Sequence, residues 1–260
     1  MRRYFKGLIA LLFIVQWQML YGQALSINTA DEPPLSFLEN GVVTGFSTDI
    51  VNDIIARTNG RGFVQMVPWS RAYKTALLTP NSVVFTMGRT PLRETLFHWV
   101  GPLVKKRWVL YSLKNRGFEI ADLADVSSLT IGVVRDDARA NFLKSSGLKN
   151  IYEVDDHHIA LNMLMKGRVD LWAASDFEGP MLIKDSGFNV KELESVFVIK
   201  TIESYIGISL ATDQNVVKAW QAAFQELKKD KVLNQVAQKW RGLTGLKMTG
   251  QYGVIEILPN

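Results

Sequence analysis

The sequence predicts an α/β protein built of two lobes. Short apolar runs alternate along the chain with segments of helical periodicity, a pattern typical of strand–helix–strand units with mainly parallel sheets. The same alternation starts again at Thr130 without a long linker before it, which indicates a second lobe. A chain of 260 residues can bury cores of this kind. Because it has no cysteine, its stability must come from those cores.

The first lobe begins with a predicted strand at 25–29 and a helix at 49–58. Ser47 is a natural N-cap for this helix, and Gly60 is its stop signal. A strand, a helix and two further strands follow at 64–67, 70–78, 83–86 and 108–113.

The second lobe is predicted from a strand at 130–134, after which helices and strands alternate at 138–145, 151–154, 159–166 and 170–174. Extended crossovers near 111–114 and 204–209 join the lobes, and paired strands of this kind can act as a hinge. Two amphipathic helices at 216–229 and 232–240 are expected to pack back on the first lobe. The predicted division is therefore 25–112 and 205–260 for lobe one and 113–204 for lobe two.

The N-terminus predicts export. Arg2, Arg3 and Lys6 precede an apolar run at 8–15 that is too short to span a bilayer, and small residues follow at Gly22 and Ala24. We interpret 1–24 as a cleavable signal peptide that directs the protein to the periplasm. Without it the 30 Lys and Arg fall to 27 against 25 acids, and no basic block is interleaved with aromatics, so no nucleic-acid partner is expected.

The sequence gives little support for catalysis or metal binding. His157 and His158 are neighbours, and neighbouring helical side chains point about 100° apart, so they do not form an i, i+4 metal pair. His98 is isolated, and no Gly-x-Ser-x-Gly elbow occurs. We expect no catalytic residue, no metal and no cofactor.

Short motifs along the chain form one ordered set. They are EPPLSF at 32–37, GFSTDI at 45–50, TPLRE at 90–94, WVGPL at 99–103, IGVV at 131–134, GRVD at 167–170 and KWRG at 239–242. In this order they resemble the family 3 extracellular solute-binding proteins, the polar-amino-acid receptors of ABC importers, over nearly all of the mature chain. The segments PNS at 80–82 and VPWSRA at 67–72 depart from the common family pattern and indicate a divergent branch.

The resemblance implies the two-lobed, type II periplasmic-binding fold with a two-strand hinge. It further implies a monomer that closes over a small amino-acid-like or carboxylate ligand for an ABC importer and catalyses nothing. Two alternatives remain. One is a periplasmic sensor that presents its closed form to a membrane receptor. The other is a dehydratase-like enzyme on the same scaffold, for which Glu32 and Asp176 are the suggestive acids.

Arg93 is the first candidate for ligand binding. The resemblance implies that this arginine holds a ligand carboxylate in a planar two-bond fork. Its position after a Thr-Pro turn, beyond the end of a strand, is also where open α/β sheets bind ligands. Thr86 and Gly88 lie at the same strand exit and could add a hydroxyl and a backbone donor.

Aromatic and charged residues near these positions complete the expected site of lobe one. Trp69 and Phe37 are candidates for an aromatic floor, because small-ligand sites are mostly apolar with a few placed polar groups. Arg71 could supply a second cation, and Arg89 could compete with Arg93. Glu32 either meets a ligand ammonium or faces solvent.

The second lobe is expected to contribute through the start of a helix and the end of a strand. Asp137 and Ala138 begin a helix whose free N–H groups could meet a ligand anion. The resemblance implies an acid for the ligand's α-amino group after the strand at 170–174, where Ser175 occupies the expected place and Asp176 follows one residue later. The sequence leaves open which of the two contacts the ligand.

Overall fold

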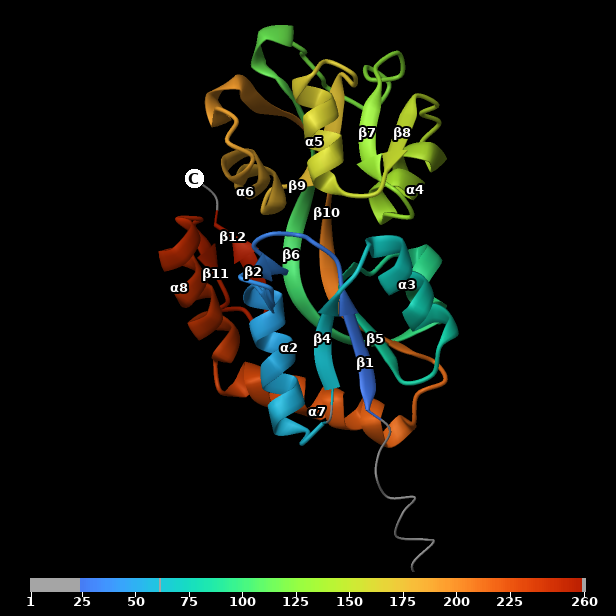
Figure 1. Ribbon diagram of the computed structural model, residues 1–260, viewed down its shortest axis with the longest axis vertical. Helices are drawn as coiled ribbons and strands as arrows, with labels where there is room; N and C mark the ends of the chain where they lie inside the picture. The colour runs from blue at the N-terminus through green and yellow to red at the C-terminus, as the bar shows by residue number, and fades with distance from the viewer. Residues whose placement is uncertain (1–23, 61, 259–260) are drawn as a thin grey trace, which may run out of the picture.

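The computed structural model describes residues 24–60 and 62–258, which form two lobes one above the other (Figure 1). The expected α/β class and two-lobed fold are confirmed. Hydrogen bonds link strands of both lobes into one path with the order β4-β1-β5-β10-β6-β9-β7-β8. The expected signal peptide at 1–24 lies, except for its last residue, outside the described residues. Within those residues, no helix has the length and apolarity needed to cross a membrane.

Lobe one is built around β1 (Leu25–Thr29), which pairs in parallel with β4 (Gly62–Met66) and β5 (Ser82–Gly88). Helix α3 (Trp69–Leu78) contacts β1 and β5. Helices α7 (Gln214–Lys229) and α8 (Val232–Thr244) pack on α2 (Phe46–Arg57). Their apolar stripes bury large side chains in the lobe's core, among them Phe46, Ile50, Trp220, Phe224 and Trp240.

Smaller elements complete this lobe. Strands β2 (Phe37–Glu39) and β3 (Val42–Thr44) form a hairpin, and β11 (Met248–Thr249) pairs with β12 (Ile255–Ile257). A 3-10 turn, η1 (Pro91–Leu96), follows β5.

Lobe two repeats the parallel arrangement around β7 (Ile131–Val134), which lies between β8 (Ile151–Val154) and β9 (Leu171–Ser175). Its helices are α4 (Ala138–Ser145), α5 (His157–Met165) and α6 (Glu178–Asp185). Two further 3-10 turns are η2 (Lys114–Arg116) and η3 (Val190–Glu192). The apolar residues of this lobe form cores on both faces of its sheet.

Two long antiparallel strands, β6 (Phe97–Leu113) and β10 (Leu193–Ser209), run through both lobes (Figure 1). Strand β6 pairs with β12 of lobe one at Lys105 and with β9 of lobe two from Trp108 onward. The crossover of β6 therefore lies between these two residues, earlier than the expected passage at 111–114 and boundary at 112. The passage itself is the charged run at 105–107, and apolar, buried residues lie on either side of it.

The start of α2 differs from the sequence expectation. The helix begins at Phe46 with Gly45 as N-cap, so Ser47 lies in the first turn, is buried and caps nothing. The burial of Phe46 explains the earlier start, because its ring packs 6.5 Å from Trp240. Gly45 has φ 127°, and a Cβ atom there would overlap the Leu35 carbonyl. The chain can enter α2 at this angle only with glycine at this position.

We expect Gly45→Ala to destabilise lobe one by more than Gly41→Ala. Both glycines have positive φ, but a Cβ at Gly41 meets nothing within 4 Å. Gly41→Ala thus carries only the left-handed backbone cost of about 1–2 kcal/mol, whereas Gly45→Ala adds a backbone clash. Urea unfolding of both variants measures the difference. Equal losses would mean that the contact with Leu35 does not restrict Gly45.

Candidate ligand-binding cleft

The two lobes enclose a cleft with two connected hollows. The larger has a volume of about 300 Å³ and the smaller about 20 Å³. Four residues line both of them: Glu32, Trp69, Asp137 and Arg139. The cleft is therefore one site with a wide outer part and a narrow inner part, and the inner part has room for about one water molecule.

The inner hollow brings together much of the site expected from sequence. The expected residues that line it are Glu32, Trp69, Thr86, Gly88, Arg93, Asp137 and Ala138. Lys106, Trp108 and Arg139 line it as well, although the sequence did not point to them. These residues come from loops, strand ends and a helix start of both lobes, so the hollow exists only while the lobes face each other.

Arg93 is a buried cation that forms no ion pair with a carboxylate among the described residues. Its side chain lies in η1 and is only 4% exposed. Its Nη1 donates to the Gly88 carbonyl at 3.4 Å, and its guanidinium lies 5.3 Å from the Trp69 ring and 4.8 Å from the Tyr73 ring. Burial lowers the pKa of Arg93, which Asp137 only partly offsets. Burying a cation in this way is costly unless an anion compensates it.

The end of β5 aims Thr86 at the hollow. Opposite β10, the register shifts between Tyr205 and Gly207, and Thr86 has φ 62°. A β-branched residue with positive φ is strained by about 1–3 kcal/mol. Bulges of this kind often redirect a side chain next to a site.

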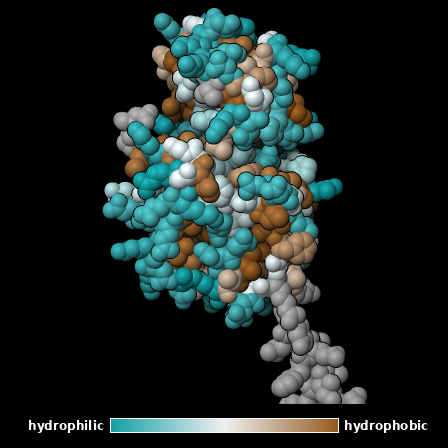
Figure 2. All heavy atoms as spheres, turned by 60° about the vertical axis from the view of Figure 1, so that its left-hand side comes forward, coloured by the Kyte–Doolittle hydropathy of each residue, from teal (hydrophilic) through white to brown (hydrophobic). Residues whose placement is uncertain are grey.

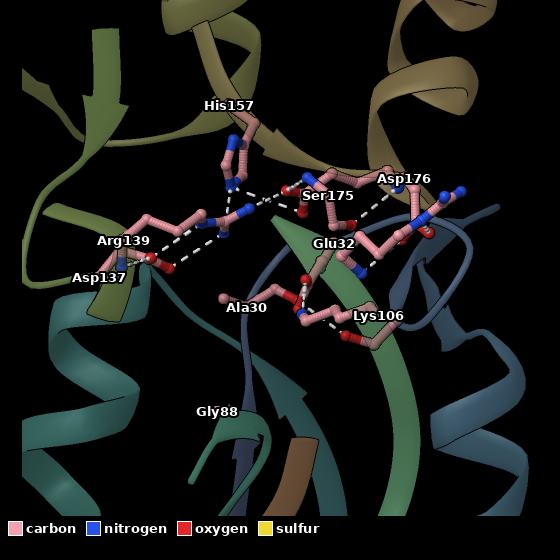
Figure 3. Close-up of polar contacts among 12 residues, drawn as sticks. Ala30, Glu32, Gly88, Lys106, Asp137, Arg139, His157, Ser175 and Asp176 are labelled. Atoms are coloured by element: carbon pink, nitrogen blue, oxygen red, sulfur yellow. Dashed lines mark hydrogen bonds and ion pairs between the residues drawn. The ribbon is translucent and has the colours of Figure 1, made fainter. Parts of the chain in front are cut away.

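A buried ion pair crosses the floor of the cleft. Lys106, on β6 near the crossover, donates to Glu32, and the two residues are 4% and 7% exposed (Figure 3). Burial raises the pKa of Glu32 to about 7, because desolvation outweighs the attraction of Lys106. Glu32 thus faces the cleft, which decides between the two orientations left open by the sequence.

The wall from lobe two is a network centred on Arg139, which Figure 3 shows extended between Asp137 and His157. Arg139 makes a two-bond fork to Asp137, with Nε–Oδ1 at 2.9 Å and Nη2–Oδ2 at 3.0 Å, and it also pairs with Glu178. Burial alone would raise the pKa of Glu178, but Arg139 and His157 lower it to about 2. The Asp137 side chain also accepts from the Arg139 backbone N–H at 2.6 Å and so caps α4.

Ser175 and Asp176 do not line the cleft, contrary to expectation. The Ser175 hydroxyl accepts from the Glu178 N–H at 3.2 Å, and Glu178 Oε1 accepts from the Ser175 N–H at 2.6 Å. This reciprocal pair has the hydrogen-bond pattern of a capping box and lies in the turn that precedes α6, whose N-cap is Phe177. Asp176 accepts from the backbone N–H and Nε of Arg107 at 3.0 and 2.9 Å. The polar groups of both side chains therefore have hydrogen-bond partners within the protein, Ser175 in the turn before α6 and Asp176 on the neighbouring strand.

Arg71 and Phe37 are also outside the two hollows. Arg71 is exposed on α3, because Ala72 and Ala76 occupy the buried face of that helix. Phe37 packs edge-on against Trp240, with ring centroids 5.9 Å apart. Arg89 pairs with Glu94 and does not line the cleft either.

The missed residues left a usable signal in one case. Along β6, Val104, Lys106 and Trp108 share one buried face, while Lys105 and Arg107 are exposed. A lysine at an inward position of a strand is unusual and points to a buried partner. Arg139 gave no comparable signal, because an arginine in the first turn of a helix is ordinary at the surface.

The lobes touch in this structure through Asp136, which has φ 59°. Its carbonyl accepts from Trp69 Nε1 at 3.0 Å and from Arg93 Nη2 at 3.1 Å, and its carboxylate lies 3.5 Å from Lys74 Nζ. We call this set the Asp136 contact. It closes the cleft by placing a backbone oxygen of lobe two on the arginine of lobe one.

Residues 25–243 match the family described as bacterial extracellular solute-binding proteins, family 3. The chain belongs to this family. Since it is a family of binding proteins, the chain is a solute-binding protein and not an enzyme. In the described residues no group of three or more acids, histidines or cysteines could hold a metal ion.

Solved structures agree with the fold of this solute-binding protein. It is similar to holo ArgBP from T. maritima, with 18% identity, 84% of this chain and 95% of that chain covered, and a TM-score of 0.71. It is also similar to a histidine kinase sensor domain with similarity to periplasmic binding proteins. The identity is 16%, 85% of this chain and 97% of that chain are covered, and the TM-score is 0.78. A third similar structure is the arginine-, lysine-, histidine-binding protein ArtJ from Geobacillus stearothermophilus. The identity is 14%, 85% of this chain and 96% of that chain are covered, and the TM-score is 0.75. No curated protein sequence matches the chain.

We expect Trp69→Phe to open the unliganded solute-binding protein. The substitution keeps a ring beside Arg93 but removes the N–H that bonds Asp136. Loss of about 1 kcal/mol would shift the balance of closed and open forms about fivefold. Small-angle scattering should then give a larger radius of gyration. Lys74→Ala is the control, because its exposed ion pair contributes little, and an equal radius for wild type and Trp69→Phe would contradict the prediction.

We expect stability to fall between pH 5 and pH 8 through Glu32. A raised carboxyl pKa contributes stability that is complete below the ordinary value of 4.5 and is lost as pH rises through about 7. The loss should be about 2 kcal/mol. Urea unfolding at both pH values should show a smaller decline in Glu32→Gln, and equal declines would exclude this role. Glu178 acts in the opposite sense, since its contribution is lost only as pH falls from 4.5 towards 2.

Proposed function

We propose that this solute-binding protein captures a small amino-acid-like ligand in the periplasm and that Arg93 holds the ligand's carboxylate. The observation that carries the proposal is the state of Arg93: a buried guanidinium in the cleft whose described partners are carbonyl oxygens and aromatic rings. A carboxylate would compensate this charge through a planar fork.

The Asp136 contact supports this assignment. A carbonyl oxygen of lobe two already accepts from Nη2 of Arg93. A ligand carboxylate offers the same guanidinium a charged acceptor, and hydrogen bonds to charged groups are stronger than those to neutral ones. The ligand would therefore replace the Asp136 carbonyl when the lobes open and close again, and lobe closure remains part of the proposed function.

The opposite end of the ligand would meet carboxylates. Glu32 and Asp137 line both hollows, and they replace Ser175 and Asp176 as the candidates for an ammonium group. In the fully ionised state the buried cations Arg93, Lys106 and Arg139 balance the carboxylates Glu32, Asp137 and Glu178. A zwitterionic head group preserves this balance, whereas a bare anion would leave one uncompensated negative charge.

Transfer of the ligand to an ABC importer follows from the family resemblance and belongs to the proposal. The relatives named for arginine, lysine and histidine binding support the amino-acid class. A signalling role would use the same capture step. Export to the periplasm, with removal of 1–24, places that step outside the cytoplasm.

We expect Arg93→Ala to weaken binding by about thirtyfold or more, because truncation leaves the ligand's anion unpaired in a buried site. Arg93→Lys should recover little, since a point charge cannot form the fork. Thermal shift against the twenty amino acids, their amides and small dicarboxylates identifies a ligand, and calorimetry then measures its affinity.

Arg71→Ala is the matched control, because it removes the same charge from an exposed position outside the cleft. Circular dichroism checks that each variant is folded. Normal binding by folded Arg93→Ala would overturn the assignment of the carboxylate. If no carboxylate-bearing compound shifts the melting temperature of the wild type, the ligand class is wrong.

A further inference from the structure

A third hollow lies beside the cleft and belongs to no part of the site described so far. Its volume is about 340 Å³. It is lined by Asp31, Pro33, Phe37, Leu38, Met66, His158, Leu182 and Asp185. We call it the side pocket. It involves β2 of lobe one and α6 of lobe two, which lie on the left of Figure 1, the side that Figure 2 turns forward.

The side pocket adjoins the outer hollow of the cleft. Asp31, Met66 and His158 line both the outer hollow of the cleft and the side pocket. Between the two, His158 Nε2 of lobe two lies 3.2 Å from Asp31 Oδ2 of lobe one, and this pair is half-exposed. A ligand that extends past this bridge passes from one hollow into the other without leaving the interface between the lobes.

The walls of the side pocket are mainly apolar. Pro33 and Leu182 are buried, whereas Leu38 is 54% exposed although its neighbours in the pocket are apolar. The face in Figure 2 is mostly hydrophilic, with apolar side chains in small separate groups. An apolar chain in the side pocket would cover Leu38 and remove apolar surface from water.

The charges of the side pocket favour a cation. Asp31 is paired with His158, and its hydrogen bond raises the pKa of that histidine. Asp185, at the end of α6, forms no hydrogen bond or ion pair among the described residues, although its charge also helps to raise the pKa of His158. With His158 protonated, the two carboxylates Asp31 and Asp185 leave the pocket one net negative charge, and Asp185 is the one not bonded to His158. A group that enters along the apolar walls and reaches Asp185 is therefore best matched by an ammonium or guanidinium.

We propose that the side pocket binds the tail of an elongated ligand, whose apolar chain ends in a cation near Asp185. This inference rests on the proposed function, because the ligand's head remains at Arg93. Both lobes supply the walls, so the pocket is complete only when they are closed. Its occupant would thus arrive with the ligand of the cleft. A short amino acid such as alanine has no tail to place there.

Three probes with the same head group test the proposal: alanine, Nε-hexanoyl-lysine and Nε-(6-aminohexanoyl)-lysine. The first has no tail, the second has an apolar tail, and the third adds a terminal ammonium. We expect calorimetry on the mature protein to rank their affinities in this order, with the two lysine derivatives about tenfold or more above alanine, because each buried CH₂ adds to binding.

Substitutions of two exposed side chains test the apolar wall and the charged end of the pocket independently. Leu38→Ser should weaken both tailed probes about threefold to tenfold without changing alanine, because it removes an apolar wall. Asp185→Asn should weaken only the aminohexanoyl probe, about twofold to fivefold, as expected for an exposed ion pair. Glu119→Gln is the matched control, since this exposed acid of lobe two lies outside all three hollows.

The outcomes distinguish this inference from the proposed function. If alanine binds as tightly as the tailed probes, or if the two side-pocket variants change alanine as much as the tailed probes, the side pocket takes no tail. If the neutral and charged tails bind equally and Asp185→Asn has no effect, the cationic end is wrong. If none of the probes binds and Arg93→Ala is also without effect on any carboxylate ligand, both proposals fail together.

Discussion

Five charged side chains are buried where the lobes meet and a sixth is half-buried, and the arrangement of the cleft depends on how their charges are compensated. The buried ones are the cations Arg93, Lys106 and Arg139 and the carboxylates Glu32 and Glu178, and the half-buried one is Asp137. An isolated buried ion costs several kcal/mol, so each must find a partner. Arg139 holds two carboxylates and Lys106 holds the third. Arg93 contacts only carbonyl oxygens and aromatic rings. Of the three cations it is therefore the one whose charge a ligand anion would compensate most.

The same charges lie where the chain passes from one lobe to the other. Lys106 follows the last residue of β6 that pairs with lobe one and precedes the first that pairs with lobe two. Its partner Glu32 is carried by lobe one, while Arg139 belongs to lobe two. When the lobes separate, water reaches groups that are buried in the closed form, and their desolvation cost falls. Closure, solvation and protonation of Glu32 are for this reason parts of one equilibrium.

The closed arrangement also explains why a polar cleft is stable without a large apolar contact across it. The Asp136 contact satisfies two donors of lobe one with a single carbonyl. On the other side of the cleft, Phe177 of lobe two packs 5.4 Å from Phe46 of lobe one. Together with the Asp31–His158 pair and the packing of Val134 beside Trp69, these contacts are local, as suits lobes that separate and rejoin during ligand exchange.

Local sequence could predict the secondary-structure elements around the site but only some of the residues that line it. Arg93, Thr86 and Gly88 were predictable because turns and strand ends are encoded within a few residues. Ser175 and Asp176 were expected in the cleft because a strand ends there. Instead, Ser175 exchanges hydrogen bonds with Glu178, and Asp176 accepts from Arg107. Which acid after a strand faces a ligand depends on partners far away in the sequence.

The sequence by itself determined the α/β class, the two lobes, the C-terminal helices and Arg93 in the turn that follows β5. Hydrophobic periodicity, caps and turn residues are local properties, and they survive in any chain segment taken alone. The tertiary structure decided the crossover of β6, the Glu32–Lys106 pair, the Arg139 network and the side pocket. Each joins residues that are distant along the chain, and only packing brings their charges and surfaces into contact.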